Sequence, residues 1–116
     1  MSFTKEQVLK ELKSDSVVIL NVLSEENYKK VHIKGSQNIP WGSDREAFAR
    51  KVEERFGRDK FFITHCSGFS CSAGPNAAKF LKEKGFKADY YPGGMEEWME
   101  NGLPVDEAEA PIPASV

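Results

Sequence analysis

Two cysteines five positions apart, Cys66 and Cys71, are the residues of this chain best suited to covalent chemistry. Cys66 directly follows an apolar run that begins at Phe61, and small residues follow it. This pattern is typical of a buried strand that ends in a tight loop before a helix. Backbone N–H groups in such a loop, together with the positive end of the helix dipole, stabilise a thiolate. The sequence therefore predicts a nucleophilic Cys66; the alternative is a buried, unreactive cysteine.

The loop after Cys66 has a composition suited to binding an anion. Its small residues allow consecutive N–H groups to point toward one place, and Gly68 can adopt a positive φ if the turn needs it. The bound anion could be the thiolate itself, a persulfide or an oxyanionic substrate. The expected substrate-binding loop consists of Ser67, Gly68, Phe69, Ser70, Cys71 and Ser72.

Three further side chains near these motifs have alternative interpretations. Cys71 is either a resolving thiol, which attacks a persulfide or sulfenate on Cys66 and closes a disulfide, or a cysteine that points into the core. His65 precedes the nucleophile, but successive strand side chains point to opposite faces, so we expect His65 to be packed rather than to act as a base. His32 is expected to fix a turn.

Composition excludes several classes of function. The 116 residues are 40% hydrophobic and 29% charged, with a formal net charge of −2, so a basic surface for nucleic acid or an anionic membrane is not expected. The apolar runs are too short to span a bilayer, the N-terminus has no signal-peptide pattern, and we expect a cytoplasmic location. The cysteine and histidine spacing fits no metal site, and neither a metal nor a cofactor is expected.

Strands and helices are expected to alternate along the chain, which predicts the α/β class with a parallel sheet covered by helices on both faces. Cys66 then lies at the carboxyl ends of the strands, where such sheets place functional sites. Expected strands are 17–22, 37–39, 61–65 and 88–91. Expected helices are 4–13, 25–31, one that ends at Gly57, one through Lys84 after the loop, and a short one with Met95, Trp98 and Met99 on one face.

The helix before Gly57 is expected to begin with a capping box formed by Ser43 and Glu46, and Phe48 then starts its apolar stripe. A single domain is expected over residues 1–105. Residues 106–116 are acidic and contain prolines, which predicts a flexible C-terminal tail.

Three segments, in order, resemble the single-domain rhodanese-like proteins. Residues 17–40 resemble the family's first signature, in which an Asp-Val-Arg type triplet precedes an acidic helix and a His-Ile-x-Gly turn. Residues 61–71 resemble the strand and active-site loop, and residues 80–105 resemble the closing pattern with Gly-Gly and Trp. The resemblance covers about residues 5 to 105. It implies a three-layer α/β sandwich.

The resemblance also implies a sulfurtransferase in which Cys66 carries sulfane sulfur as a persulfide. The donor would be thiosulfate or a persulfide-bearing protein, and the acceptor a thiol or cyanide. This chain departs from the family pattern, because Asn21 and Leu23 stand where aspartate and arginine are usual, and no Arg or Lys follows Cys66 before Lys79. Since an arginine fork normally holds a doubly charged oxyanion, we expect weak thiosulfate turnover and a different donor.

Two competing hypotheses remain. The departures from the family pattern favour a non-catalytic rhodanese-like binding module or a thiol redox-sensing module. The run from His65-Cys66 to Gly74-Pro75 instead suggests a phosphatase or arsenate reductase of the same fold. The arginine that such enzymes use for charge stabilisation is missing from this loop, which counts against the last hypothesis.

Overall fold

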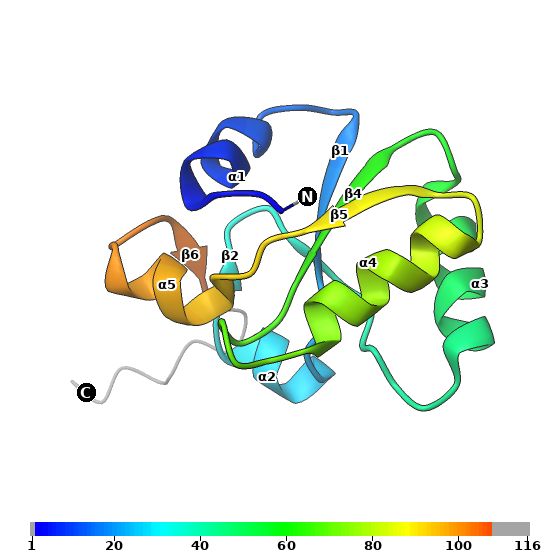
Figure 1. Ribbon diagram of the computed structural model, residues 1–116. Helices are drawn as coiled ribbons and strands as arrows, with labels where there is room; N and C mark the ends of the chain where they lie inside the picture. Colours follow the sequence, from blue (N-terminus) through cyan, green and yellow to red (C-terminus); the bar gives the residue numbers. More distant parts are fainter. Residues whose placement is uncertain (1, 108–116) are drawn as a thin grey trace.

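A four-stranded parallel sheet forms the centre of the computed structural model, which describes residues 2–107 (Figure 1). The strand order is β3-β1-β4-β5, so the chain crosses over between neighbouring strands, as helical connections require. The predicted parallel α/β class is confirmed. The strands of this sheet are β1 (Val17–Asn21), β3 (Gln37–Asn38), β4 (Phe61–His65) and β5 (Lys87–Tyr90).

Five helices lie within the described residues, and they divide between the two faces of the sheet. In Figure 1, α3 and α4 lie together on one side, and α1 and α5 lie on the other. This arrangement gives the three expected layers. The helices are α1 (Lys5–Glu11), α2 (Glu25–Lys30), α3 (Arg45–Phe56), α4 (Ala73–Glu83) and α5 (Gly94–Glu100).

Two hydrophobic clusters fill the spaces between these layers. Leu20 and Phe62 belong to the cluster under α3 and α4, whereas Ile19 and Ile63 belong to the cluster under α1 and α5. Neighbouring residues of one strand therefore serve opposite clusters, as the alternation of a strand requires. Because both faces are covered, the apolar run in β1 shows no polar alternation.

The predicted start of α3 is wrong by one residue. Asp44, not Ser43, is the N-cap: its Oδ1 accepts a hydrogen bond from the Ala47 N–H at 3.0 Å. No Ser43–Glu46 capping box forms, because the helix begins at Arg45 and the cap must directly precede it. A carboxylate in this position also interacts favourably with the helix dipole.

The predicted inner face of α5 is also partly wrong. Met95 and Trp98 are buried, but Met99 is 47% exposed. The Trp98 indole donates a hydrogen bond to the Pro104 carbonyl at 2.8 Å, which fixes that face inward. Met99 is one residue further along the helix, about 100° around its axis, and so lies at the solvent boundary.

A short antiparallel pair, β2 (His32–Ile33) and β6 (Val105–Asp106), joins two segments far apart in the sequence. This pair was not predicted, because each strand has only two residues. His32 contacts α2 before it: its Nδ1 lies 2.8 Å from the Tyr28 carbonyl oxygen, and its ring stacks on Tyr28. The expectation that it fixes the His-Ile-x-Gly turn stays a prediction.

Strand β6 extends one residue past the expected domain boundary at 105. Most of the predicted tail, residues 108–116, lies outside the described residues. Within residues 2–107, no helix has both the length and the apolar character needed to cross a membrane.

Candidate active site at the carboxyl edge of the sheet

Strands β1 and β4 end side by side, and this shared end positions the site. Asn21 pairs with His65 in the parallel register, and the Val22 N–H donates to the His65 carbonyl at 3.0 Å. Cys66 is the next residue, so the chain leaves the sheet at its carboxyl edge with the cysteine. This is the position in the fold that the sequence predicted.

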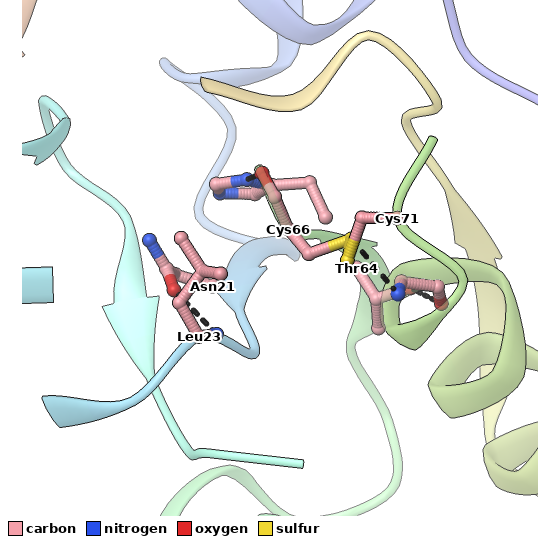
Figure 2. Close-up of a disulfide and its surroundings, with 7 residues drawn as sticks. Asn21, Leu23, Thr64, Cys66 and Cys71 are labelled. Atoms are coloured by element: carbon pink, nitrogen blue, oxygen red, sulfur yellow. Dashed lines mark hydrogen bonds between the residues drawn. A yellow bond between two sulfur atoms is a disulfide. The ribbon is translucent and has the colours of Figure 1, made fainter. Parts of the chain in front are cut away.

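Cys66 is almost fully buried, with 2% exposure, and its sulfur forms a disulfide with Cys71 (Figure 2). The Gly74 N–H donates a hydrogen bond to Cys66 Sγ at 3.3 Å. Gly74 lies in the first turn of α4, where backbone N–H groups have no partner within the helix. The cysteine sulfur therefore faces the positive end of an eleven-residue helix.

Thr64 lies two residues before Cys66 and points to the same face of β4. Its Oγ1 donates a hydrogen bond to the Gly74 carbonyl at 2.6 Å. A Cβ at position 74 would lie 3.2 Å from His65 Cα, so glycine allows the helix to approach the strand closely. Thr64 thus holds the residue whose N–H contacts the sulfur. The sequence analysis missed this role, although the two-residue spacing to Cys66 was visible.

The loop itself is shaped by a turn and by contacts with α5. The Cys71 N–H donates to the Gly68 carbonyl at 3.0 Å, which closes the turn. The N–H groups of Met95 and Glu96 donate to the carbonyls of Cys66 and Ser67, at 3.0 and 2.7 Å. Two helices therefore hold the loop, with α4 contacting the sulfur and α5 the carbonyl groups.

The positive φ lies in α5 rather than in the loop. Gly68 has no positive φ, whereas Gly94 has φ +58°. A Cβ on Gly94 would lie 2.5 Å from the Cys66 carbonyl oxygen and 2.7 Å from the Gly68 nitrogen. Only a residue without a side chain fits between α5 and the loop.

The predicted loop residues differ in their positions. Gly68 is buried, Cys71 is half-buried against the α3/α4 cluster, and Phe69 is 65% exposed. Among the described residues, only one backbone N–H contacts Cys66 Sγ, so the sulfur does not receive the several donors that a full cradle would supply. The remaining loop residues, Ser67, Ser70 and Ser72, are exposed.

Cys71 has a defined partner. Its Cα lies 6.4 Å from that of Cys66, and the two sulfurs are bonded. Cys71 is therefore bonded to Cys66 and does not point into the core as an isolated side chain. A catalytic role as a resolving thiol stays a prediction.

His65 lies on the opposite face of β4 from the Cys66 sulfur. It is fully buried, its Nδ1 lies 3.4 Å from the Cys66 carbonyl oxygen, and its ring is 6.4 Å from that of Tyr91. Burial lowers the pKa of His65 to about 4, so the imidazole is neutral at physiological pH. The expectation of a packed histidine agrees with this geometry.

The Asn21 side chain stabilises the turn at the end of β1. Its Oδ1 accepts a hydrogen bond from the Leu23 N–H at 2.8 Å (Figure 2). The Asn38 amide donates to the carbonyls of Asn21 and Leu23, at 3.0 and 2.9 Å. Side-chain amides therefore fix the turn at the positions where the family pattern usually has aspartate and arginine.

The sequence profile of the rhodanese-like domain matches residues 4–101 of this chain. The chain belongs to the rhodanese-like domain family. The predicted family and its fold, a parallel sheet between layers of helices, are confirmed. A crystal structure of a Bacillus halodurans protein shares this fold with a TM-score of 0.81 and 24% identity, covering 92% of this chain and 77% of that one.

Two curated relatives of this rhodanese-like domain have different names. A Saccharomyces cerevisiae protein named thiosulfate:glutathione sulfurtransferase is 31% identical over 96 residues, covering 75% of this chain and 68% of the relative. An HTH-type transcriptional regulator of Mycobacterium tuberculosis is 31% identical over 111 residues, covering 96% of this chain but only 46% of the regulator. The chain thus spans about half the length of the regulator.

Proposed function

We propose that this rhodanese-like domain is a sulfurtransferase that carries sulfane sulfur as a persulfide on Cys66. One observation carries the proposal: the Cys66 sulfur lies at the carboxyl edge of the sheet and accepts the N–H of Gly74 in the first turn of α4. The helix dipole and this N–H stabilise negative charge on the sulfur. The same groups would stabilise a persulfide anion, since its charge is on the outer sulfur, only one bond away from Cys66 Sγ.

The chemistry begins with reduction of the Cys66–Cys71 disulfide by two equivalents of a thiol, which leave as their own disulfide. The Cys66 thiolate then attacks the outer sulfur of a donor, the donor's S–S bond breaks, and the remainder of the donor leaves with the electron pair. From thiosulfate this leaving group is sulfite. An acceptor thiolate next attacks the outer sulfur of the persulfide, so that a new persulfide leaves and Cys66 returns as a thiolate.

The charge of the loop limits the choice of donor. The segment from Ser67 to Ala78 contains no Arg or Lys, so no cationic fork within it can bind thiosulfate. We expect weak turnover with thiosulfate and faster loading from a persulfide donor, either small or carried by a protein. The name of the yeast relative makes thiosulfate and glutathione the first donor and acceptor to test.

Cys71 has a place in this scheme as a resolving thiol. In the persulfide state, a Cys71 thiolate can attack Cys66 Sγ, close the disulfide and release hydrosulfide. The bonded sulfurs support this assignment, because Cys71 lies within bonding reach of Cys66 in the loop.

Intact mass spectrometry of the reduced protein tests the proposal. After incubation with thiosulfate or with glutathione persulfide, we expect an adduct of one sulfur atom in the wild type and none in Cys66→Ser. In Cys71→Ser the adduct should persist longer, because the resolving step is removed. An adduct that survives in Cys66→Ser, or no adduct from either donor, would contradict the proposal.

A thiol redox-sensing module is the second candidate function. Two observations favour it: the Cys66–Cys71 disulfide, and the similarity to a protein named as a transcriptional regulator. A sensor should form the disulfide rapidly with dilute hydrogen peroxide, without accepting sulfur. Comparing the rates of sulfur loading and of disulfide formation on the same reduced sample separates the two functions.

A further inference from the structure

A polar cavity of about 190 Å³ lies beside α4, on the face of the sheet to which the Cys66 sulfur points. Trp41 on one side and Phe80 on the other pack against the same hydrophobic cluster that contains Cys66. The cavity is thus bordered by α4 and by the segment that leads from β3 into α3 (Figure 1). Its lining residues are Trp41, Arg45, Asn76, Lys79, Phe80 and Glu83.

Backbone hydrogen bonds place this cavity near the candidate active site. The Trp41 N–H donates to the Val22 carbonyl at 3.0 Å, and the Val22 N–H donates to the His65 carbonyl at the same distance. Trp41 is therefore two strand spacings, about 10 Å, from the end of β4. Along α4, Asn76 and Lys79 follow Gly74 by two and five residues, which is about 3 and 8 Å of helix rise.

The charged groups of the cavity are available for a ligand. Among residues 2–107, neither Arg45 nor Lys79 has an ion pair within 4 Å or a side-chain hydrogen bond, and neither does Glu83. The Arg45 guanidinium lies over the Trp41 ring, 5.4 Å from its centroid, and this contact orients it. Two cations and one carboxylate thus surround the cavity.

This charge pattern complements a small peptide that carries two carboxylates and one ammonium group. The cavity has room for about six water molecules at about 30 Å³ each, enough for the end of such a peptide rather than for all of it. In an extended tripeptide the central residue lies about 5 Å along the backbone from a terminal carboxylate. The near end of the cavity, at Asn76, is only about 3 Å of helix rise from Gly74, whose N–H contacts Cys66 Sγ. A peptide whose terminal carboxylate enters the cavity could therefore bring its central thiol toward Cys66.

We infer that this cavity binds the carboxylate end of an anionic peptide thiol of the glutathione class, the acceptor of sulfur from Cys66. The inference rests on the proposed function and assigns the binding of the acceptor to Arg45 and Lys79. The acceptor thiolate attacks the outer persulfide sulfur, the S–S bond breaks, and glutathione persulfide leaves while Cys66 becomes a thiolate. Neither cation takes part in the bond changes.

Binding is measured first without chemistry, with S-methylglutathione as an unreactive probe and reduced protein. Trp98 is fully buried, so a change in tryptophan fluorescence on titration reports on Trp41. We expect Arg45→Ala and Lys79→Ala each to weaken binding about fivefold, since each removes one exposed ion pair of up to about 1 kcal/mol. Arg50→Ala, an exposed cation on α3 outside the cavity, is the matched control and should bind as the wild type does.

The diethyl ester of the probe, which has no free carboxylates, should bind the wild type as weakly as the free acid binds a variant that combines Arg45→Ala with Lys79→Ala. In turnover, Arg45→Ala should raise KM for glutathione about fivefold and leave KM for 2-mercaptoethanol unchanged. Equal binding of acid and ester, or equal losses in Arg50→Ala and Arg45→Ala, would overturn the inference. Sulfur loading of Cys66 in these same variants tests the proposed function separately, because it needs no acceptor.

Discussion

The two faces of strand β4 end in residues of opposite character. On the α3/α4 face, the Cys66 sulfur has a backbone donor, a second cysteine and a nearby cavity with unpaired cations. On the α1/α5 face, His65 and Asn21 are fully buried, and His65 Nε2 and Asn21 Nδ2 have no hydrogen-bond partner among the described residues. Neighbours in sequence are thereby separated into the candidate nucleophile and buried polar groups that face away from it.

Residues beside the proposed nucleophile need not belong to its chemistry. His65 is one peptide bond from Cys66, yet its ring lies near the Cys66 carbonyl and the Tyr91 ring, on the opposite side of the strand from the Cys66 sulfur. Thr64, one residue further away, lies on the reactive face and acts on the sulfur through Gly74. Substitutions on the two faces should therefore change different properties, and three predictions test that separation.

The largest effect is expected from Gly94→Ala, which pushes α5 away from the loop. The added Cβ would lie 2.5 Å from the Cys66 carbonyl oxygen, and φ is +58°. We expect a loss of about 3 kcal/mol or more in the free energy of unfolding, from overpacking against backbone and from the left-handed conformation. Urea unfolding measures this loss, and sulfur loading should slow as the loop shifts.

Gly102→Ala is the matched control for Gly94→Ala. Gly102 also has a positive φ of 66°, but a Cβ there would meet nothing within 4 Å. Its substitution should cost about 1 kcal/mol and leave sulfur loading unchanged. Equal losses in the two variants would show that the contact between α5 and the loop contributes nothing.

The second prediction concerns His65 and acid. In the unfolded chain this histidine binds a proton near its ordinary pKa of 6.5, whereas in the folded protein burial lowers the pKa to about 4. Between these values the unfolded state binds more protons, so stability falls as the pH is lowered through this range. The folded protein should lose about 2 kcal/mol between pH 7 and pH 4.5 because of His65.

Urea unfolding at both pH values checks the prediction, with His65→Phe as the comparison. The variant should lack this component of the pH dependence, while its sulfur loading at pH 7 stays close to that of the wild type. Identical pH dependence in the two proteins would refute the role assigned to His65. Slow loading in the variant would break the separation between the two faces.

The smallest effect is expected from Thr64→Val, which removes the hydroxyl that holds the Gly74 carbonyl. We expect a loss of about 1–2 kcal/mol in stability, because a buried hydrogen bond between β4 and α4 is lost. Sulfur loading should slow roughly threefold, because the Gly74 N–H is held less firmly at Cys66 Sγ. This is a small change in the activation free energy, since about 1.4 kcal/mol corresponds to a factor of ten in rate.

Tyr28→Phe is the matched control for this variant. The Tyr28 hydroxyl also donates to a carbonyl, that of Ser36, at 2.6 Å, but it lies away from the loop. The control should lose similar stability and load sulfur at the wild-type rate. If both variants load equally fast, Thr64 has only a structural role.

Much of the fold could be predicted from the sequence, because each element has a strong local signal. The apolar run of β1 and the Thr4-x-x-Gln7 pattern at the start of α1 are examples, and Thr4 and Gln7 form a capping box in the structure. The pairing of β2 with β6 could not be predicted, because two-residue strands have no periodicity. The predicted N-cap of α3 was wrong for a related reason: Ser43 and Asp44 are both good capping residues, and only the backbone conformation selects between them.

For the site, the sequence indicated the position of Cys66 but not its contacts. The expected donors were assigned to the loop, whereas the structure supplies one from α4, held by Thr64. The cavity could not be predicted at all, because Trp41 and Lys79 come together only through the order of strands β3, β1 and β4. Contacts across the sheet depend on this topology rather than on local composition.

The hydrogen bond from Gly74 to the Cys66 sulfur has a consequence for mutagenesis. Every residue except proline carries the same N–H, so replacing a side chain at this position would not remove the donor itself. Alanine at position 74 would keep the donor but crowd the His65 backbone, so an alanine scan would report the packing of Gly74 and not the hydrogen bond that the main chain provides. Replacing the amide that contributes this N–H with an ester, by chemical synthesis, would remove the donor alone.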